Sequence, residues 1–129
     1  LDYFIYSNTI SPIYNYPIKN LVVTNINNVY FINNISKDTI NYFNSYYIHF
    51  DLSNLTLEQQ TDFKISKTSD GTHTTGGVEY NTTLVGTVLQ FYTTENNTFY
   101  YYSHTHTNSG GTINITQPSI HFKNCLRSV

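Results

Sequence analysis

The sequence predicts an all-β protein, a two-sheet antiparallel sandwich with at most one short helix. Aromatic residues make up 16% of the 129 residues, and together with Ile, Val and Thr they favour the pleated surface of strands. About eight to ten short runs of such residues are separated by Asn, Gly, Pro and Ser, which is typical of sandwiches and barrels. The clearest run, residues 46–53, alternates strictly. Ile48 and Phe50 fall on the face expected to pack on the core, opposite His49.

The chain is expected to divide into an arm, one domain and a tail. Residues 1–17 should form an extended N-terminal arm or edge strand, because Pro12 and Pro17 interrupt regular structure. Residues 18–123 form the single sandwich domain, and residues 124–129 form a C-terminal tail. The arm carries three tyrosines that are candidates for contact with a neighbouring subunit: Tyr3, Tyr14 and Tyr16.

The other expected strands are residues 21–24, 29–32, 39–43, 63–66, 88–93, 98–103 and 112–116. Alternation places four apolar side chains inward: Phe63, Ile65, Ile113 and Ile115. The runs 88–93 and 98–103 are expected to pair as a hairpin, because turn-forming residues join them.

Two segments interrupt the strand pattern. Residues 68–83 hold Asp-Gly and Gly-Gly pairs and almost no apolar residue, so they are expected to form a surface loop or hairpin tip. Residues 55–60 are the one segment with helical character. Asn54 or Ser53 is expected to cap this short helix.

The composition argues against nucleic acid and membrane as partners. Charged residues make up only 11% of the chain and the formal net charge is −2, so the chain has no basic field to hold a polyanion or an anionic bilayer. No apolar stretch is long enough to span a bilayer. Cys125 is the single cysteine, so no internal disulfide is expected.

His104 and His106 are the one pair of potential metal ligands that the sequence places together in a turn. Two residues apart, they share a face of a strand or converge on one ion. A mononuclear copper or zinc site needs three or four ligands, and the sequence supplies only this pair, so no cofactor is expected. A hydrolase using Ser103 or Ser109 lacks the nucleophile elbow, and no enzymatic activity is expected.

Three consecutive tyrosines, residues 100–102, must place rings on both faces of a strand. At least one ring is therefore expected at the surface, where tyrosine is a common component of protein and sugar contacts. Tyr101 is the candidate, with His73 in the 68–83 loop as another. Together with the 103–111 loop, these residues suggest a module that binds a receptor or a glycan.

Three motifs occur in a fixed order: Phe-Asp-Leu-Ser at residues 50–53, Ser-Asp-Gly-Thr-His at residues 69–73, and Tyr-Tyr-Tyr at residues 100–102 leading to Gly-Gly-Thr at residues 110–112. Over about residues 28–116 the chain resembles a cupredoxin-like module of structural and fibre-associated proteins from large DNA viruses and marine phages. The resemblance implies a cupredoxin-like or immunoglobulin-like Greek-key sandwich and a role in a virion.

The resemblance also implies where copper ligands would stand in the copper-binding relatives of such modules. Matching by position places Ser103 at the Cys ligand, His106 at the His ligand and Ser109 at the weak Met ligand, with His49 as the candidate for the second His. A Ser hydroxyl does not replace a soft thiolate. A redox copper site is therefore not expected.

The preferred hypothesis is a virion structural protein, such as a minor capsid, decoration or fibre component, located in the virion or another extracellular surface structure. Low charge and Asn- and Thr-rich faces favour close packing against copies of itself, as a homo-oligomer or lattice, or against other coat subunits. Two alternatives stay open. One is an adhesin module that binds a host glycan or receptor, and the other is a degenerate metal-binding protein that uses His104 and His106.

Overall fold

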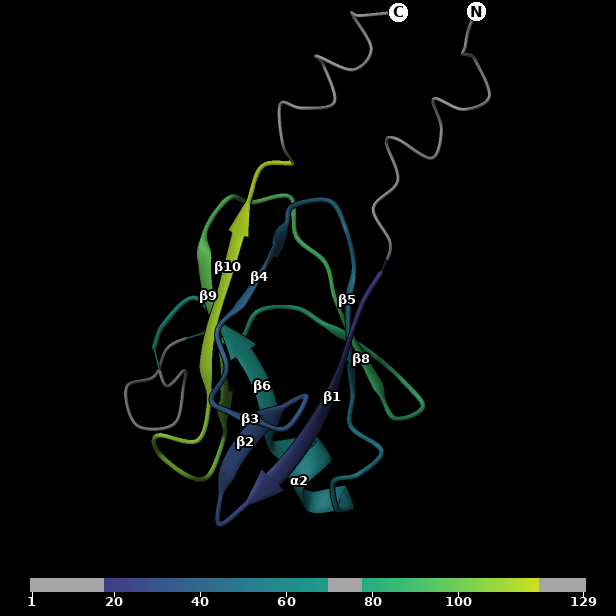
Figure 1. The fold of residues 1–129 in the computed structure, drawn as a ribbon, viewed down its shortest axis with the longest axis vertical. Coiled ribbons are helices and arrows are strands. Elements are labelled where there is room, and N and C mark those ends of the chain that lie inside the picture. Colours follow the sequence, from purple (N-terminus) through teal and green to yellow (C-terminus); the bar gives the residue numbers. More distant parts are fainter. Residues whose placement is uncertain (1–17, 70–77, 119–129) are drawn as a thin grey trace, which may run out of the picture.

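The computed structural model describes residues 18–69 and 78–118 and shows two facing β-sheets with one short helix (Figure 1). The six-stranded sheet contains, in spatial order, β3 (Ile35–Ser36), β2 (Val29–Ile32), β1 (Lys19–Ile26), β5 (Ile48–Asp51), β8 (Val88–Phe91) and β7 (Thr83–Val85). The four-stranded sheet contains β4 (Ile40–Phe43), β10 (Gly111–Thr116), β9 (Thr98–Ser103) and β6 (Phe63–Ser66). The predicted all-β, two-sheet fold is confirmed.

The strand pairing departs from the purely antiparallel arrangement that was expected. β1 pairs with β5 in parallel, and β10 pairs with β4 in parallel, while the other strand pairs are antiparallel. After β3 the chain crosses to the opposite sheet to form β4 and then returns as β5. Such a crossover brings β5 beside β1 in the same direction, which a tight hairpin cannot do.

Asparagine pairs form the first two hairpin turns. Asn27 and Asn28, between β1 and β2, have φ of 53° and 66°. Asn33 and Asn34, between β2 and β3, have φ of 48° and 70°. Two-residue hairpins of this kind require positive φ at both central positions, and Asn tolerates that region better than other non-glycine residues. The predicted Asn-rich turns are confirmed.

The core lies between the two sheets and matches the predicted alternation. Ile48, Phe50 and Leu52 are fully buried at the centre of the six-stranded sheet. The four side chains predicted to point inward from the other sheet are also buried: Phe63, Ile65, Ile113 and Ile115. Burial of each side chain of this size stabilises the fold by about 1.5–3 kcal/mol.

The predicted hairpin of residues 88–93 and 98–103 is wrong. β8 and β9 belong to different sheets, and their rings meet across the core, where Phe91 and Phe99 lie edge to face with centroids 5.2 Å apart. β8 lies between two antiparallel partners, β5 and β7, and β7 is an edge strand that the sequence reasoning missed. Gly86, with φ of 62°, forms the turn between them.

The helix α2 (Leu57–Asp62) begins later than predicted, at the lower end of the sandwich in Figure 1. Thr56, rather than Asn54 or Ser53, is the N-cap, and it forms a capping box with Gln59. Ser53 is instead held in the preceding turn, where its backbone N–H donates to the Asp51 carboxylate at 3.0 Å. The helix therefore begins at Leu57 rather than at Leu55.

Within residues 18–69 and 78–118, no helix is long and apolar enough to cross a membrane. The expected arm at 1–17 and the expected tail at 124–129 lie outside the described residues.

Candidate functional site

The loop from Ser103 to Ser109 is organised by one carboxylate at the end of α2. Ser103 Oγ donates to Asp62 Oδ2 at 3.0 Å, and the Thr105 hydroxyl donates to the same oxygen. Ser103 Oγ in turn accepts the backbone N–H groups of Thr105, at 3.2 Å, and His106, at 3.1 Å. The Ser103 side chain is buried, and its hydroxyl links the loop to α2.

The ring of His106 is turned toward Thr105 rather than toward the Ser103 hydroxyl. Thr105 Oγ1 lies 2.9 Å from His106 Nδ1. Because the Thr105 hydroxyl donates its proton to Asp62, it accepts from His106, which places the ring proton on Nδ1. His104 is exposed, and its backbone N–H donates to the Asp62 carbonyl at 2.9 Å. No three His, Cys, Asp or Glu side chains among the described residues are grouped so as to hold a metal ion.

The positions matched to copper ligands do not fit a copper site. Ser109 is fully buried, and its hydroxyl donates to the His106 carbonyl at 3.2 Å. His49 lies on the outer face of β5, where its ring is 5.9 Å from that of Tyr47. The hydroxyls at Ser103 and Ser109 are therefore engaged in closing the loop, and His49 points away from the core that they border.

Buried Tyr30 lies under this loop. Burial, followed by the nearby Asp62 carboxylate, raises the pKa of the Tyr30 phenol, while a hydrogen bond with Ser103 opposes the rise. The phenol therefore stays protonated at physiological pH and acts as a neutral part of the loop's support.

The expectation that Tyr101 contacts a partner is wrong. Its side chain is 1% exposed, and its hydroxyl donates to the Asp38 carbonyl at 2.7 Å. Burial and the Asp38 carboxylate both raise the pKa of Tyr101. Tyr101 points inward because it shares a face of β9 with Phe99. Of the two neighbours Tyr100 and Tyr101, Tyr100 is the one whose ring reaches the surface. The other contact candidates lie outside the described residues: His73, Tyr3, Tyr14 and Tyr16.

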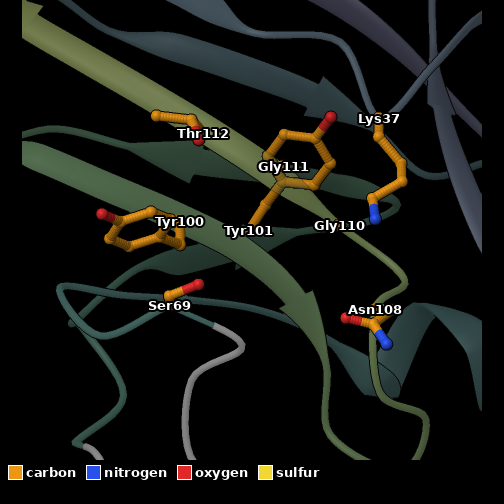
Figure 2. A pocket seen from close by; sticks show the side chains of 8 residues that line it. All are labelled: Lys37, Ser69, Tyr100, Tyr101, Asn108, Gly110, Gly111 and Thr112. Atoms are coloured by element: carbon orange, nitrogen blue, oxygen red, sulfur yellow. The ribbon is translucent and has the colours of Figure 1, made fainter.

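A pocket of about 300 Å³ opens beside Tyr100, where β9 ends and β10 begins. Figure 2 shows Tyr100 and Ser69 on one side of it and Lys37 and Asn108 on the other, with the Gly110–Gly111 backbone between them. Thr112 and the edge of Tyr101 complete the lining. The pocket unites the two loops that the sequence singled out for ligand contact, at Ser69 and at residues 108–110.

The floor of the pocket is formed by Gly110 and Gly111, where no residue larger than glycine fits. A Cβ at Gly111 would lie 2.7 Å from the Tyr101 hydroxyl and 2.8 Å from the Lys37 carbonyl, and a Cβ at Gly110 would lie 1.7 Å from the Tyr101 carbonyl. Backbone and side chains are too close for any larger residue. The floor of the pocket is therefore bare backbone.

Among the described residues that line this pocket, Lys37 is the only charged one. The other lysines of the described segments have partners: Lys64 pairs with Glu79 at 3.5 Å, Lys67 pairs with Glu95 at 3.0 Å, and Lys19 lies over the Tyr42 ring at 5.4 Å. No such partner is found for the Lys37 ammonium among the described residues.

The outer face of the six-stranded sheet is a second candidate region. Five apolar side chains on this face are each at least 40% exposed: Val22, Ile26, Tyr47, Val85 and Tyr92. Strand register places Val22, Asp51, Val88 and Val85 in one row across four strands. Asp51 is the only charged residue that these strands place on the face.

The outer face of the four-stranded sheet is polar and internally hydrogen-bonded. Asn114 lies in the middle of a row with Asn41 and Thr98. Its amide donates to Asn41 Oδ1 at 3.2 Å, and its carbonyl oxygen accepts from Thr98 Oγ1 at 3.4 Å. The row satisfies its own polar groups across three strands.

A scan against protein-family models and searches of curated proteins and of solved structures found no match for this chain. The resemblance to cupredoxin-like virion modules therefore stays a prediction from the sequence motifs.

Proposed function

We propose that this chain is a structural subunit that assembles through the outer face of its six-stranded sheet, as a component of a virion coat, decoration or fibre. The exposed apolar side chains on that face, accompanied by a single carboxylate, are the observation that carries the proposal. Apolar area with few charges forms an interface without a large desolvation cost.

The face offers a contact area for a second copy of the chain. Its strands β1, β2, β3, β5, β8 and β7 have 8, 4, 2, 4, 4 and 3 residues, which at about 3.3 Å per residue and about 4.8 Å between strands give a projected area of roughly 400 Å². This is about half of the roughly 800 Å² that each partner contributes to a standard interface, so the contact is expected to be weak and reversible. A second copy is the occupant that we assign to this face.

The virion setting rests on the sequence motifs at residues 50–53, 69–73 and 100–112. A face that associates with copies of itself suits a coat or fibre, in which one contact is repeated many times. Cofractionation of the chain with purified particles would support this setting. Recovery of the chain only in the particle-free fraction of the producing cells would refute it.

Sedimentation velocity over a concentration series tests the assembly itself. The wild-type chain is expected to dimerise at micromolar concentration. Val22→Lys, in the middle of the face, should raise the dissociation constant by at least about tenfold, or about 1.4 kcal/mol. Thr116→Lys makes the same change of charge on the polar sheet and should leave association unchanged. A wild-type chain that stays monomeric at all concentrations, or two variants with equal effects, would refute the proposed face.

A further inference from the structure

We propose that the pocket between Lys37 and Tyr100 binds a carboxylated sugar, such as a terminal sialic or uronic acid of a glycan. This inference concerns a different surface from the assembly face and does not depend on that proposal. It is carried by a cation without an ion-pair partner in the described part of the chain, a partly exposed aromatic ring and uncharged hydrogen-bonding side chains, which meet around one cavity (Figure 2).

Charge selects an acidic ligand. Among residues 18–69 and 78–118, the Lys37 ammonium has no ion-pair partner and no carboxylate lines the pocket. The Asp38 carboxylate, next to Lys37 in the sequence, acts on the Tyr101 hydroxyl at the pocket edge. A ligand carboxylate placed beside Lys37 is attracted by the ammonium, and the Asp38 carboxylate opposes this attraction.

Shape and side-chain chemistry select a sugar rather than a bare carboxylate. The volume of about 300 Å³ is at the lower end of ligand pockets and suits one monosaccharide. The Tyr100 ring offers an aromatic surface for the apolar face of a sugar ring. Ser69 and Thr112 supply hydroxyl groups that both donate and accept hydrogen bonds, as sugar hydroxyls require.

The bare Gly110–Gly111 floor allows close approach of a ligand to the backbone. Any side chain at Gly111 would meet the Tyr101 hydroxyl or the Lys37 carbonyl, so the cavity is maintained by the same packing that requires glycine there. The pocket is thus a fixed feature of the β9–β10 connection.

Binding is tested by titrating the isotope-labelled full chain with sialyllactose, lactose and acetate and following amide shifts by NMR. Sialyllactose should shift Gly110, Gly111 and Thr112 and bind at least about tenfold more tightly than lactose or acetate, a difference of about 1.4 kcal/mol. Equal binding of lactose would overturn the role of charge. Equal binding of acetate would overturn the role of the sugar, and no shift with any probe at millimolar concentration would overturn the site.

Charge variants assign the effect to this pocket. Lys37→Gln should weaken sialyllactose binding about tenfold or more. Lys67→Gln makes the same change of charge at an ammonium directed to Glu95 and should have little effect. Asp38→Asn should strengthen binding, because it removes the opposing charge. Unchanged binding in Lys37→Gln, or weaker binding in Asp38→Asn, would contradict the proposal.

Discussion

The two sheets enclose the same core, but their outer faces differ in polarity. Ten large apolar side chains are exposed among the described residues. Leu57 lies on α2 and Val78 in a loop, and the remaining eight lie in or directly beside strands of the six-stranded sheet. None lies in the four-stranded sheet, where Asn41, Asn114 and Thr98 form a hydrogen-bonded row instead.

The difference teaches that average composition does not describe the surface of this protein. Both faces are poor in charge, but one satisfies its polar groups internally and the other leaves apolar groups without cover. Water solvates the first face at little cost, whereas the second gains free energy when a partner removes it from water. Assembly through the outer face of the six-stranded sheet alone would give a contact of defined geometry.

The two sheets also differ in how much space surrounds the glycines in their hairpin turns. At Gly110, between β9 and β10, an added Cβ would lie 1.7 Å from the Tyr101 carbonyl oxygen. At Gly86, between β7 and β8, an added Cβ would meet nothing within 4 Å, although φ is 62°. Gly110→Ala should therefore lower the free energy of unfolding by about 3 kcal/mol or more, because backbone must move. Gly86→Ala should lower it by only about 1 kcal/mol.

Urea denaturation of both variants measures this contrast. Equal losses would show that the β9–β10 connection yields as readily as an open turn, and the distinction between a rigid and an open hairpin would fail. The same measurement bears on the pocket, whose floor requires the rigid connection.

Local patterns in the sequence predicted the layers of the fold but not the order of the strands. Ile48, Phe50 and Leu52 could be placed in the core because a period of two is a local property of a strand. The pairing of β8 with β7, and not with β9, depends on Phe91 and Phe99 meeting across the core. An alternating pattern carries no information on which sheet a strand joins, so the turn residues between them were misread as a hairpin.

The site was predicted in part, for a similar reason. Residues in the 68–83 and 103–111 loops were expected to act together, and Ser69 and Asn108 do line one pocket. Three tyrosines in succession do not show which ring points inward. Tyr101 was therefore predicted as the contact residue, whereas Tyr100 is the one that reaches the surface. Lys37 gave no signal in the sequence, because its importance comes from its place in the pocket and from having no ion-pair partner among residues 18–69 and 78–118.

The polar row on the four-stranded sheet should contribute a smaller and measurable stability. Asn114→Ala removes a donor to Asn41 and an acceptor for Thr98, and it should lower the free energy of unfolding by about 1 kcal/mol. Gln90→Ala, on the outer face of the other sheet, should change it by less than about 0.5 kcal/mol. Urea denaturation compares the two. If Gln90→Ala costs as much as Asn114→Ala, the hydrogen-bonded row does not distinguish the faces.

The smallest expected effect concerns the single charge on the assembly face. The Ser53 hydroxyl and backbone N–H lower the pKa of the Asp51 carboxyl from its ordinary 3.8. Asp51 is therefore ionised at neutral pH, and two copies that meet through this face each bring a carboxylate into the contact. Asp51→Asn should tighten dimerisation about threefold, or by about 0.7 kcal/mol. Glu58→Gln, an equal change of charge on α2, should have no such effect.

The pH dependence follows from the same carboxyl, and the sign differs between association and folding. A lowered folded-state pKa stabilises the fold above the unfolded-state value, and this stability is lost as pH falls through the folded-state pKa. Dimerisation should instead strengthen as pH falls through the lowered pKa of Asp51, because protonation removes the charge. Sedimentation velocity of wild type and Asp51→Asn over this range isolates the contribution, since other carboxyls titrate in both. Weaker association of Asp51→Asn at neutral pH would mean that Asp51 makes a favourable contact across the interface. Dimerisation would then depend on this charge and not on an apolar face with few charges.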